Sequence, residues 1–116
     1  MIGIGIDAVD IPRFASMLER RPGMAERLFT AGELERPATQ SLAARFAAKE
    51  AAMKALGVGL GAFGFHDVSV VRAESGAPSL LVQGRAAELA AAAGVTRWSV
   101  SLTHTDLVAQ AVVVAL

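Results

Sequence analysis

A long alanine-rich run, SLAARFAAKEAAMKAL, is the feature of this sequence that most constrains the fold. It spans residues 41–56 and ends in a glycine cluster that begins at Gly57. At about 100° per residue, its large apolar side chains fall within an arc of roughly 80°. Its alanines form a second surface that is suited to close packing. We therefore predict a long central helix on which the other elements pack.

The charged residues of this helix, Arg45, Lys49, Glu50 and Lys54, lie among alanine and aliphatic neighbours. The opposite charges of Glu50 and Lys54, four residues apart, stabilise a helix by only about 0.2–0.5 kcal/mol. The like charges of Arg45 and Lys49, at the same spacing, destabilise it by a similar amount. Such energies are too small to explain the positions of these charges. Two interpretations remain open: the long side chains extend to solvent, or the helix forms part of a site for an anion.

A second carboxylate favours the interpretation that the helix forms part of a site. The N-terminal segment IGIGIDAV has the alternation of a buried strand, and Asp7 interrupts it near its end. If Asp7 and Glu50 converge, they supply two hard oxygen ligands of the kind that Mg²⁺ takes alongside substrate phosphates. The alternative for Asp7 is a cap or turn residue before the next helix.

Two further features have weaker functional signals. His104 lies near the end of the segment WSVSLTHT, where an imidazole is able to donate to a phosphate, although a single histidine at a strand end is usually structural. The glycine-rich segment 57–64 matches neither a Walker A nor a dinucleotide-binding fingerprint. It is more simply interpreted as the end of the central helix.

The remaining segments predict a single α+β domain over residues 1–116, with a mainly antiparallel sheet and helices on one side of it. Asp10 and Pro12 are typical of a helix start, and Thr30 with Glu33 fits a capping box in a turn that Pro37 ends. We predict strands over residues 2–9, 66–71, 79–83, 98–105 and 107–116, and further helices over 11–21, 24–29 and 85–94.

Composition narrows the class of protein. The 116 residues carry no net charge, which gives no reason to expect nucleic acid or an anionic membrane as a partner. The chain has no cysteine and no apolar run long enough to span a bilayer, and its N-terminal segment lacks the basic start of a signal peptide. We therefore expect a cytoplasmic protein.

Four motifs together resemble the bacterial holo-acyl-carrier-protein synthases, the small class of 4′-phosphopantetheinyl transferases. They are GIGIDAVDIPRF (3–14), FTAGEL (29–34), ARFAAKEAAMKALG (44–57) and SVSLTHT (99–105). The resemblance spans nearly the whole chain with the motifs in order. It implies an enzyme that transfers 4′-phosphopantetheine from coenzyme A to a serine of an apo acyl carrier protein, with Mg²⁺ as cofactor and adenosine 3′,5′-bisphosphate as the second product.

The resemblance also implies roles for individual residues. Asp7 and Glu50 would hold Mg²⁺, and both would act in catalysis with Lys54. Glu50, directly or through a water, would accept the serine proton, with a water held by Asp7 as a variant. The coenzyme would be bound by Arg45, Lys49, Lys54, Pro78 and His104.

A homotrimer with sites between protomers is a further implication. The carrier protein would dock through an acidic helix on the region of Arg13, Met17, Arg20 and Arg27, although these arginines alone also fit a solvated helix face. The segment Glu35–Gln40 is shorter than in many relatives, which leaves carrier selectivity open. The alternatives to the transferase are a Mg²⁺-dependent nucleotide phosphohydrolase and a non-catalytic trimeric subunit of the same fold.

Overall fold

The computed structural model describes residues 1–35 and 38–116. Part of the Glu35–Gln40 segment, including the turn ending predicted at Pro37, therefore lies outside the described residues. The elements are β1 (Gly3–Asp10), α1 (Ile11–Arg20), α2 (Met24–Leu28), η1 (Glu33–Glu35), α3 (Thr39–Leu56), η2 (Phe65–Asp67), β2 (Val68–Arg72), β3 (Pro78–Val82), α4 (Gly84–Ala92), β4 (Trp98–His104) and β5 (Val108–Ala115).

The predicted order of strands and helices is confirmed, with small differences at the boundaries. The central helix α3 begins at Thr39 rather than Ser41. The strand that we predict from residue 66 begins only at Val68, because Phe65–Asp67 forms a 3₁₀ turn. At the start of α1, the Asp10 carboxylate accepts a hydrogen bond from the Arg13 amide at 3.0 Å, as expected for an N-cap.

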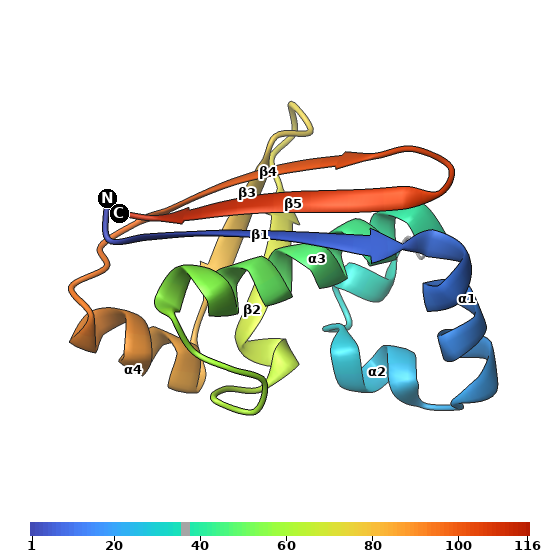
Figure 1. The fold of residues 1–116 in the computed structure, drawn as a ribbon, viewed down its shortest axis with the longest axis horizontal. Coiled ribbons are helices and arrows are strands. Elements are labelled where there is room, and N and C mark those ends of the chain that lie inside the picture. The colour runs from blue at the N-terminus through green and yellow to red at the C-terminus, as the bar shows by residue number, and fades with distance from the viewer. Residues whose placement is uncertain (36–37) are drawn as a thin grey trace.

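The strands are antiparallel, as predicted, but they divide between two sheets. One has the order β1-β5-β4, and the other consists of the hairpin β2-β3. Figure 1 shows α3 running beneath the three-stranded sheet, with α1 and α2 at one end and α4 at the other. The hairpin β2-β3 crosses behind α3, and the two chain termini lie side by side. The α+β prediction with a long helix packed on a sheet is confirmed.

Glycines in β1 allow the strand to lie directly on the backbone of α3. A Cβ added at Gly3 would overlap the carbonyl oxygen of Ala55, and one added at Gly5 would overlap that of Ala51. Only a residue without a side chain permits this approach. The two glycines therefore set the distance between the strand and the helix that carry the proposed metal ligands.

The alanines of α3 are buried on several sides of the helix, since it contacts the sheet and α1 as well as β2. The core contains Ala47, Ala48, Ala51 and Ala52, each without exposed surface. A helix enclosed in this way shows no single apolar stripe, which accounts for the charged residues among its apolar neighbours. Within the described residues, none of the helices is long and apolar enough to cross a membrane.

Candidate active site

The register of β1 directs Asp7 toward α3. Asp7 lies opposite Ala111 in the ladder with β5, and Ala111 is buried against the helix. Side chains of directly paired residues project from the same face of a sheet. Asp7 is therefore neither a cap nor a turn residue: it is within the strand, and the N-cap is Asp10.

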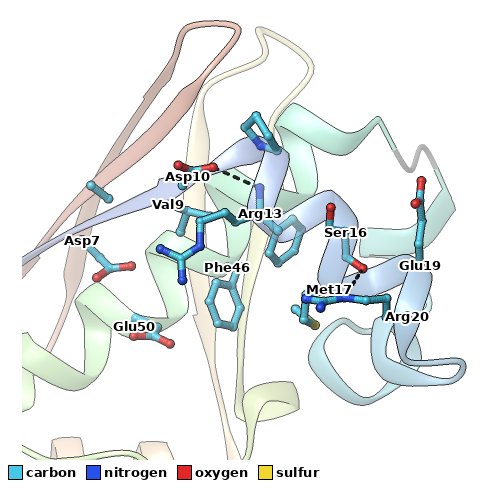
Figure 2. A pocket seen from close by; sticks show the side chains of 13 residues that line it. Asp7, Val9, Asp10, Arg13, Ser16, Met17, Glu19, Arg20, Phe46 and Glu50 are labelled. Carbon is cyan, nitrogen blue, oxygen red and sulfur yellow. Dashed lines mark hydrogen bonds between the residues drawn. The ribbon is translucent and has the colours of Figure 1, made fainter.

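Asp7 and Glu50 meet at one end of a hollow of about 970 Å³, which we call the carboxylate hollow. Figure 2 shows the two carboxylates on facing elements, β1 and α3, with the side chains of α1 extending along the hollow from them. The residues that line it are Asp7, Ala8, Val9, Asp10, Pro12, Arg13, Phe14, Ser16, Met17, Glu19, Arg20, Phe46 and Glu50.

Burial raises the pKa of Glu50 above its ordinary value, and the Asp7 carboxylate raises it further, whereas Lys54 lowers it. Repulsion between two carboxylates is relieved when a cation lies between them. The donors are hard carboxylate oxygens, which suit Mg²⁺. The pair thus fits a magnesium ion in both charge and ligand type.

Lys54 contacts the strand rather than its neighbour on the helix. Its ammonium donates to the Ile6 carbonyl at 2.9 Å and to the Asp7 carboxylate at 3.2 Å. Among the ion pairs of the described residues, Lys54 is joined to Asp7 and not to Glu50. The Lys54 side chain remains 55% exposed, so its charge is available to an anion beside Asp7.

Lys49, which the resemblance includes among the coenzyme-binding residues, lies inside the protein. Its ammonium is fully buried, lies 2.8 Å from the Glu33 carboxylate, and also donates to the carbonyls of Phe65 and Val68. These contacts use its three donors. Lys49 thus joins α3 to η1, η2 and β2, and it has no N–H group left for a coenzyme phosphate.

Glu33 is the partner that sequence reasoning missed. We identify it only as a capping-box residue, and it does accept from the Thr30 amide while the Thr30 hydroxyl accepts from the Glu33 amide. The same carboxylate also accepts from Lys49 and from the Val70 amide. Its negative charge acts on both Arg45 and Lys49, which makes their like-charge spacing tolerable inside the protein.

The predicted coenzyme residues Arg45 and His104 line two smaller hollows, separate from the carboxylate hollow. We call them the arginine hollow, which is lined by Gly32, Glu33, Glu35, Arg45, Arg72, Ala73, Glu74 and Gly76, and the histidine hollow, which is lined by Ser41, Ala44, Arg72, Leu102, Thr103 and His104. Pro78 begins β3 and pairs with Arg72 across the hairpin.

Three of the four predicted carrier-docking residues line the carboxylate hollow, and the fourth does not. Arg13, Met17 and Arg20 of α1 line the carboxylate hollow, and Figure 2 shows them along α1. Arg27 belongs to α2 and is not among the lining residues. The first three therefore share a hollow with the proposed metal ligands.

Phe46 of α3 also lines the carboxylate hollow. Its ring packs against Phe14 at 5.4 Å and Phe65 at 5.7 Å between centroids. Phe14 in turn meets Phe29 edge to face at 6.2 Å. This aromatic row fixes α1 against α3 and thereby holds the two walls of the carboxylate hollow together.

The chain is similar to proteins of one known superfamily. The pattern of the 4′-phosphopantetheinyl transferase superfamily matches residues 3–112. The chain is 54% identical over 112 residues to a holo-[acyl-carrier-protein] synthase of Clavibacter michiganensis, covering 97% of this chain and 92% of that protein. It is 50% identical over 115 residues to the synthase of Frankia casuarinae, covering 99% and 97%.

A solved structure of another such synthase has a similar fold. The crystal structure of the Helicobacter pylori holo-[acyl-carrier-protein] synthase in complex with coenzyme A superimposes with a TM-score of 0.87, at 32% identity and with 97% of this chain and 99% of that chain covered. The chain belongs to the 4′-phosphopantetheinyl transferase superfamily. Within it, the chain is an enzyme of the holo-acyl-carrier-protein synthase family, which confirms the resemblance that its motifs carry.

Proposed function

We propose that the protein transfers 4′-phosphopantetheine from coenzyme A to a serine hydroxyl of an apo acyl carrier protein, with Mg²⁺ as cofactor and adenosine 3′,5′-bisphosphate as the second product. One observation carries this proposal. A single hollow has Asp7 and Glu50 at one end and a wall formed by α1, where Arg13 and Arg20 are exposed. In this proposal, the phosphate-transfer site therefore lies beside the helix that docks the carrier protein.

Asp7 and Glu50 are the residues that would hold the magnesium ion. Their carboxylates share the same end of the hollow, and their mutual repulsion favours a cation. When bound, Mg²⁺ supplies charge neutralisation and Lewis-acid polarisation at the diphosphate of coenzyme A. Lys54 supports this arrangement because it orients Asp7 through a hydrogen bond and keeps an exposed positive charge beside it.

The reaction makes one bond and breaks one bond at the same phosphorus. The serine oxygen attacks the phosphorus that carries the pantetheine arm, and the phosphorus–oxygen bond to the adenosine 3′,5′-bisphosphate breaks. Glu50, directly or through a water, accepts the serine proton, and burial supports this role because it makes the carboxylate more basic. The remaining work of the chain is to position two substrates and stabilise negative charge.

The active protein is, in this proposal, a homotrimer with sites between protomers. The outer face of the three-stranded sheet supports it: Ile4 and Ile6 are 57% and 59% exposed, and they pair with Val114 and Val112 of β5. An apolar sheet face of this kind is typical of a subunit interface. The separate hollows of Asp7 and His104 also support it, since a neighbouring protomer would bring one set of residues to the other.

The carrier protein belongs to fatty-acid or polyketide biosynthesis in this proposal, and the reaction takes place in the cytoplasm, where coenzyme A is available. Docking of the carrier involves Arg13, Met17 and Arg20, while Arg27 contributes from α2, outside the carboxylate hollow. Mass spectrometry of an apo acyl carrier protein, after incubation with this protein, coenzyme A and Mg²⁺, tests the proposal.

A further inference from the structure

Glu33 and Lys49 form a buried ion pair that has no part in the reaction as proposed above. The Lys49 ammonium lies 2.8 Å from the Glu33 carboxylate, and both side chains are shielded from solvent. A buried ion pair adds little net stability, because the cost of removing two charges from water largely cancels their attraction. Apolar side chains of similar volume often serve a fold equally well. Stability alone therefore does not account for charges at this position.

The pair attaches one side of α3 to three other segments. The Lys49 ammonium donates to the Glu33 carboxylate of η1. It also donates to the carbonyls of Phe65 in η2 and Val68 in β2. The second oxygen of the Glu33 carboxylate accepts from the Val70 amide of β2 at 3.1 Å. Because hydrogen bonds are directional, this network fixes the direction in which Lys49 leaves the helix, which apolar contacts would not do.

The strand β1 holds the other side of α3. Its two glycines lie directly against the carbonyl oxygens of Ala51 and Ala55. At about 100° per residue, Ala51 and Ala55 lie about 200° and 240° around the helix from Lys49. The strand and the buried pair thus hold α3 from nearly opposite sides.

Glu50 lies between these two attachments, about 100° around the helix from both Lys49 and Ala51. Its carboxylate shares one end of the carboxylate hollow with Asp7 (Figure 2). A side chain ends about 5–6 Å from the helix axis, so a rotation of α3 by about 20° would move the Glu50 carboxylate by about 2 Å. Mg²⁺ takes oxygen ligands at about 2.0–2.1 Å in a near-octahedral arrangement. Such a rotation would therefore separate Glu50 from a metal ion at Asp7.

We propose that Glu33 and Lys49 are positioning residues for the transfer reaction. Their buried pair sets the rotation of α3 about its axis and thereby holds the Glu50 carboxylate where it shares a metal ion with Asp7. This rests on the proposed function, in which those two carboxylates hold Mg²⁺. Glu33 and Lys49 act through the helix and touch neither metal nor substrate.

The test replaces both members of the pair, so that no charge is left buried alone. Glu33→Gln with Lys49→Met removes both charges at similar volume, and we expect this double variant to be more stable to urea than Lys49→Met alone. Mn²⁺, which also prefers oxygen ligands, is titrated into each protein, and electron paramagnetic resonance measures the free ion. The dissociation constant for Mn²⁺ should rise about 10–100-fold, as when other groups that orient metal ligands are lost.

Steady-state kinetics provide a second measurement. In the double variant, kcat should fall by a similar factor, because Glu50 is displaced. KM for the carrier protein should not change, since the docking residues Arg13 and Arg20 belong to α1. A pair that only stabilised the fold would move neither quantity in the folded variant.

Two controls separate position from charge and from stability. Arg85→Gln with Glu88→Gln removes an exposed ion pair of α4. Ala90→Gly destabilises the same helix at a buried position that does not line the carboxylate hollow. Neither control should alter the affinity for Mn²⁺.

Glu33→Asp is the second variant, and it decides the question if the double variant fails to fold. It keeps the charge but shortens the side chain by one methylene, so it should pull on Lys49 and also weaken Mn²⁺ binding. Wild-type affinity for Mn²⁺ in either folded variant would overturn the inference, while the proposed function stands. An equal loss of affinity in Ala90→Gly would overturn it as well. If the wild-type protein binds no Mn²⁺, the proposed metal site and the inference fail together.

Discussion

The ammonium of Lys49 lies 2.8 Å from the carboxylate of Glu33, and neither side chain has more than 2% of its surface exposed. This pair connects the turn before α3 to the middle of that helix. The Val70 amide and the Val68 carbonyl bind the same two groups, so β2 is fixed at the same point. The residue after Lys49 is the proposed metal ligand Glu50, and the buried pair therefore helps to fix the part of α3 that carries it.

Loss of one member of this pair should destabilise the fold strongly. Lys49→Met leaves the Glu33 carboxylate buried without its cation, and such a change costs about 3–5 kcal/mol. Urea unfolding measures it. Arg85→Met is the control, since Arg85 forms an exposed pair with Glu88 at 3.1 Å and exposed pairs contribute about 0–1 kcal/mol. Equal, small losses in both variants would contradict a structural role for Lys49.

The second prediction concerns pH in the metal-free protein. The folded-state pKa of Glu50 is raised, first by burial and then by Asp7, so its ionisation disfavours the folded state. The folded protein therefore has its full stability, as far as Glu50 is concerned, below the pKa of this group in the unfolded chain, about 4.3. It loses stability as the pH rises through the pKa of Glu50 in the folded protein. Glu50→Gln cannot ionise, and we expect it to melt at a higher temperature than the wild type at neutral pH.

Thermal unfolding in the presence of a chelator, from pH 7 downward, measures this difference. The two melting temperatures should converge as the pH falls below about 4, where Glu50 is protonated. Added Mg²⁺ should then stabilise the wild type more than Glu50→Gln at neutral pH, because the variant lacks one proposed ligand. A wild type that is the more stable of the two at neutral pH without metal would refute the prediction.

Much of this fold follows from the sequence because its local signals agree with one another. Asp10 caps α1 as its position before Ile11-Pro12 predicts, and Gly57 ends α3 in a left-handed conformation with φ 69°. The alternation of β4 and the apolar run of β5 likewise predict these two strands correctly. The division into two sheets was not predictable, since strand periodicity does not state which strands pair.

The candidate site was predictable in part for a similar reason. The face of the strand on which Asp7 lies and the position of Glu50 along its helix both follow from the local sequence. These two residues do line one hollow. The sequence does not distinguish Lys49 from the other charged residues of the helix, because nothing in it shows that Glu33, 16 residues away, forms an ion pair with Lys49. Arg72 ends a strand, and only the tertiary fold brings it beside Arg45 and His104.

The docking surface gives a third prediction. Arg13→Glu with Arg20→Glu reverses two exposed charges on α1, and we expect KM for an acidic carrier protein to rise by about tenfold or more, since charge complementarity steers association. Affinity for coenzyme A should not change. Steady-state kinetics measure the first quantity and calorimetry the second. Arg85→Glu with Arg97→Glu is the control of equal net charge, and an equal rise in KM there would show a non-specific effect.

Assembly gives a fourth prediction. Ile6 is 59% exposed on the outer face of the sheet, and a charge at this position would be buried in the proposed trimer at high cost. Ile6→Glu should therefore convert trimers to monomers in analytical ultracentrifugation and lower transfer activity. Leu60→Glu changes a residue that is 75% exposed in the loop after α3 and should leave the assembly intact. A wild-type monomer would contradict the proposed interface.

The transfer reaction itself tests the central claim most directly. An apo acyl carrier protein is incubated with this protein, coenzyme A and Mg²⁺, and its intact mass is measured. We expect one 4′-phosphopantetheine to be added to a serine. The addition should be lost with Asp7→Asn, with Glu50→Gln or with a chelator, and retained with Glu88→Gln, which changes an exposed carboxylate of α4. Absence of any mass gain on several carrier proteins would contradict the proposed function, and full activity of folded Asp7→Asn or Glu50→Gln would remove that residue from the site.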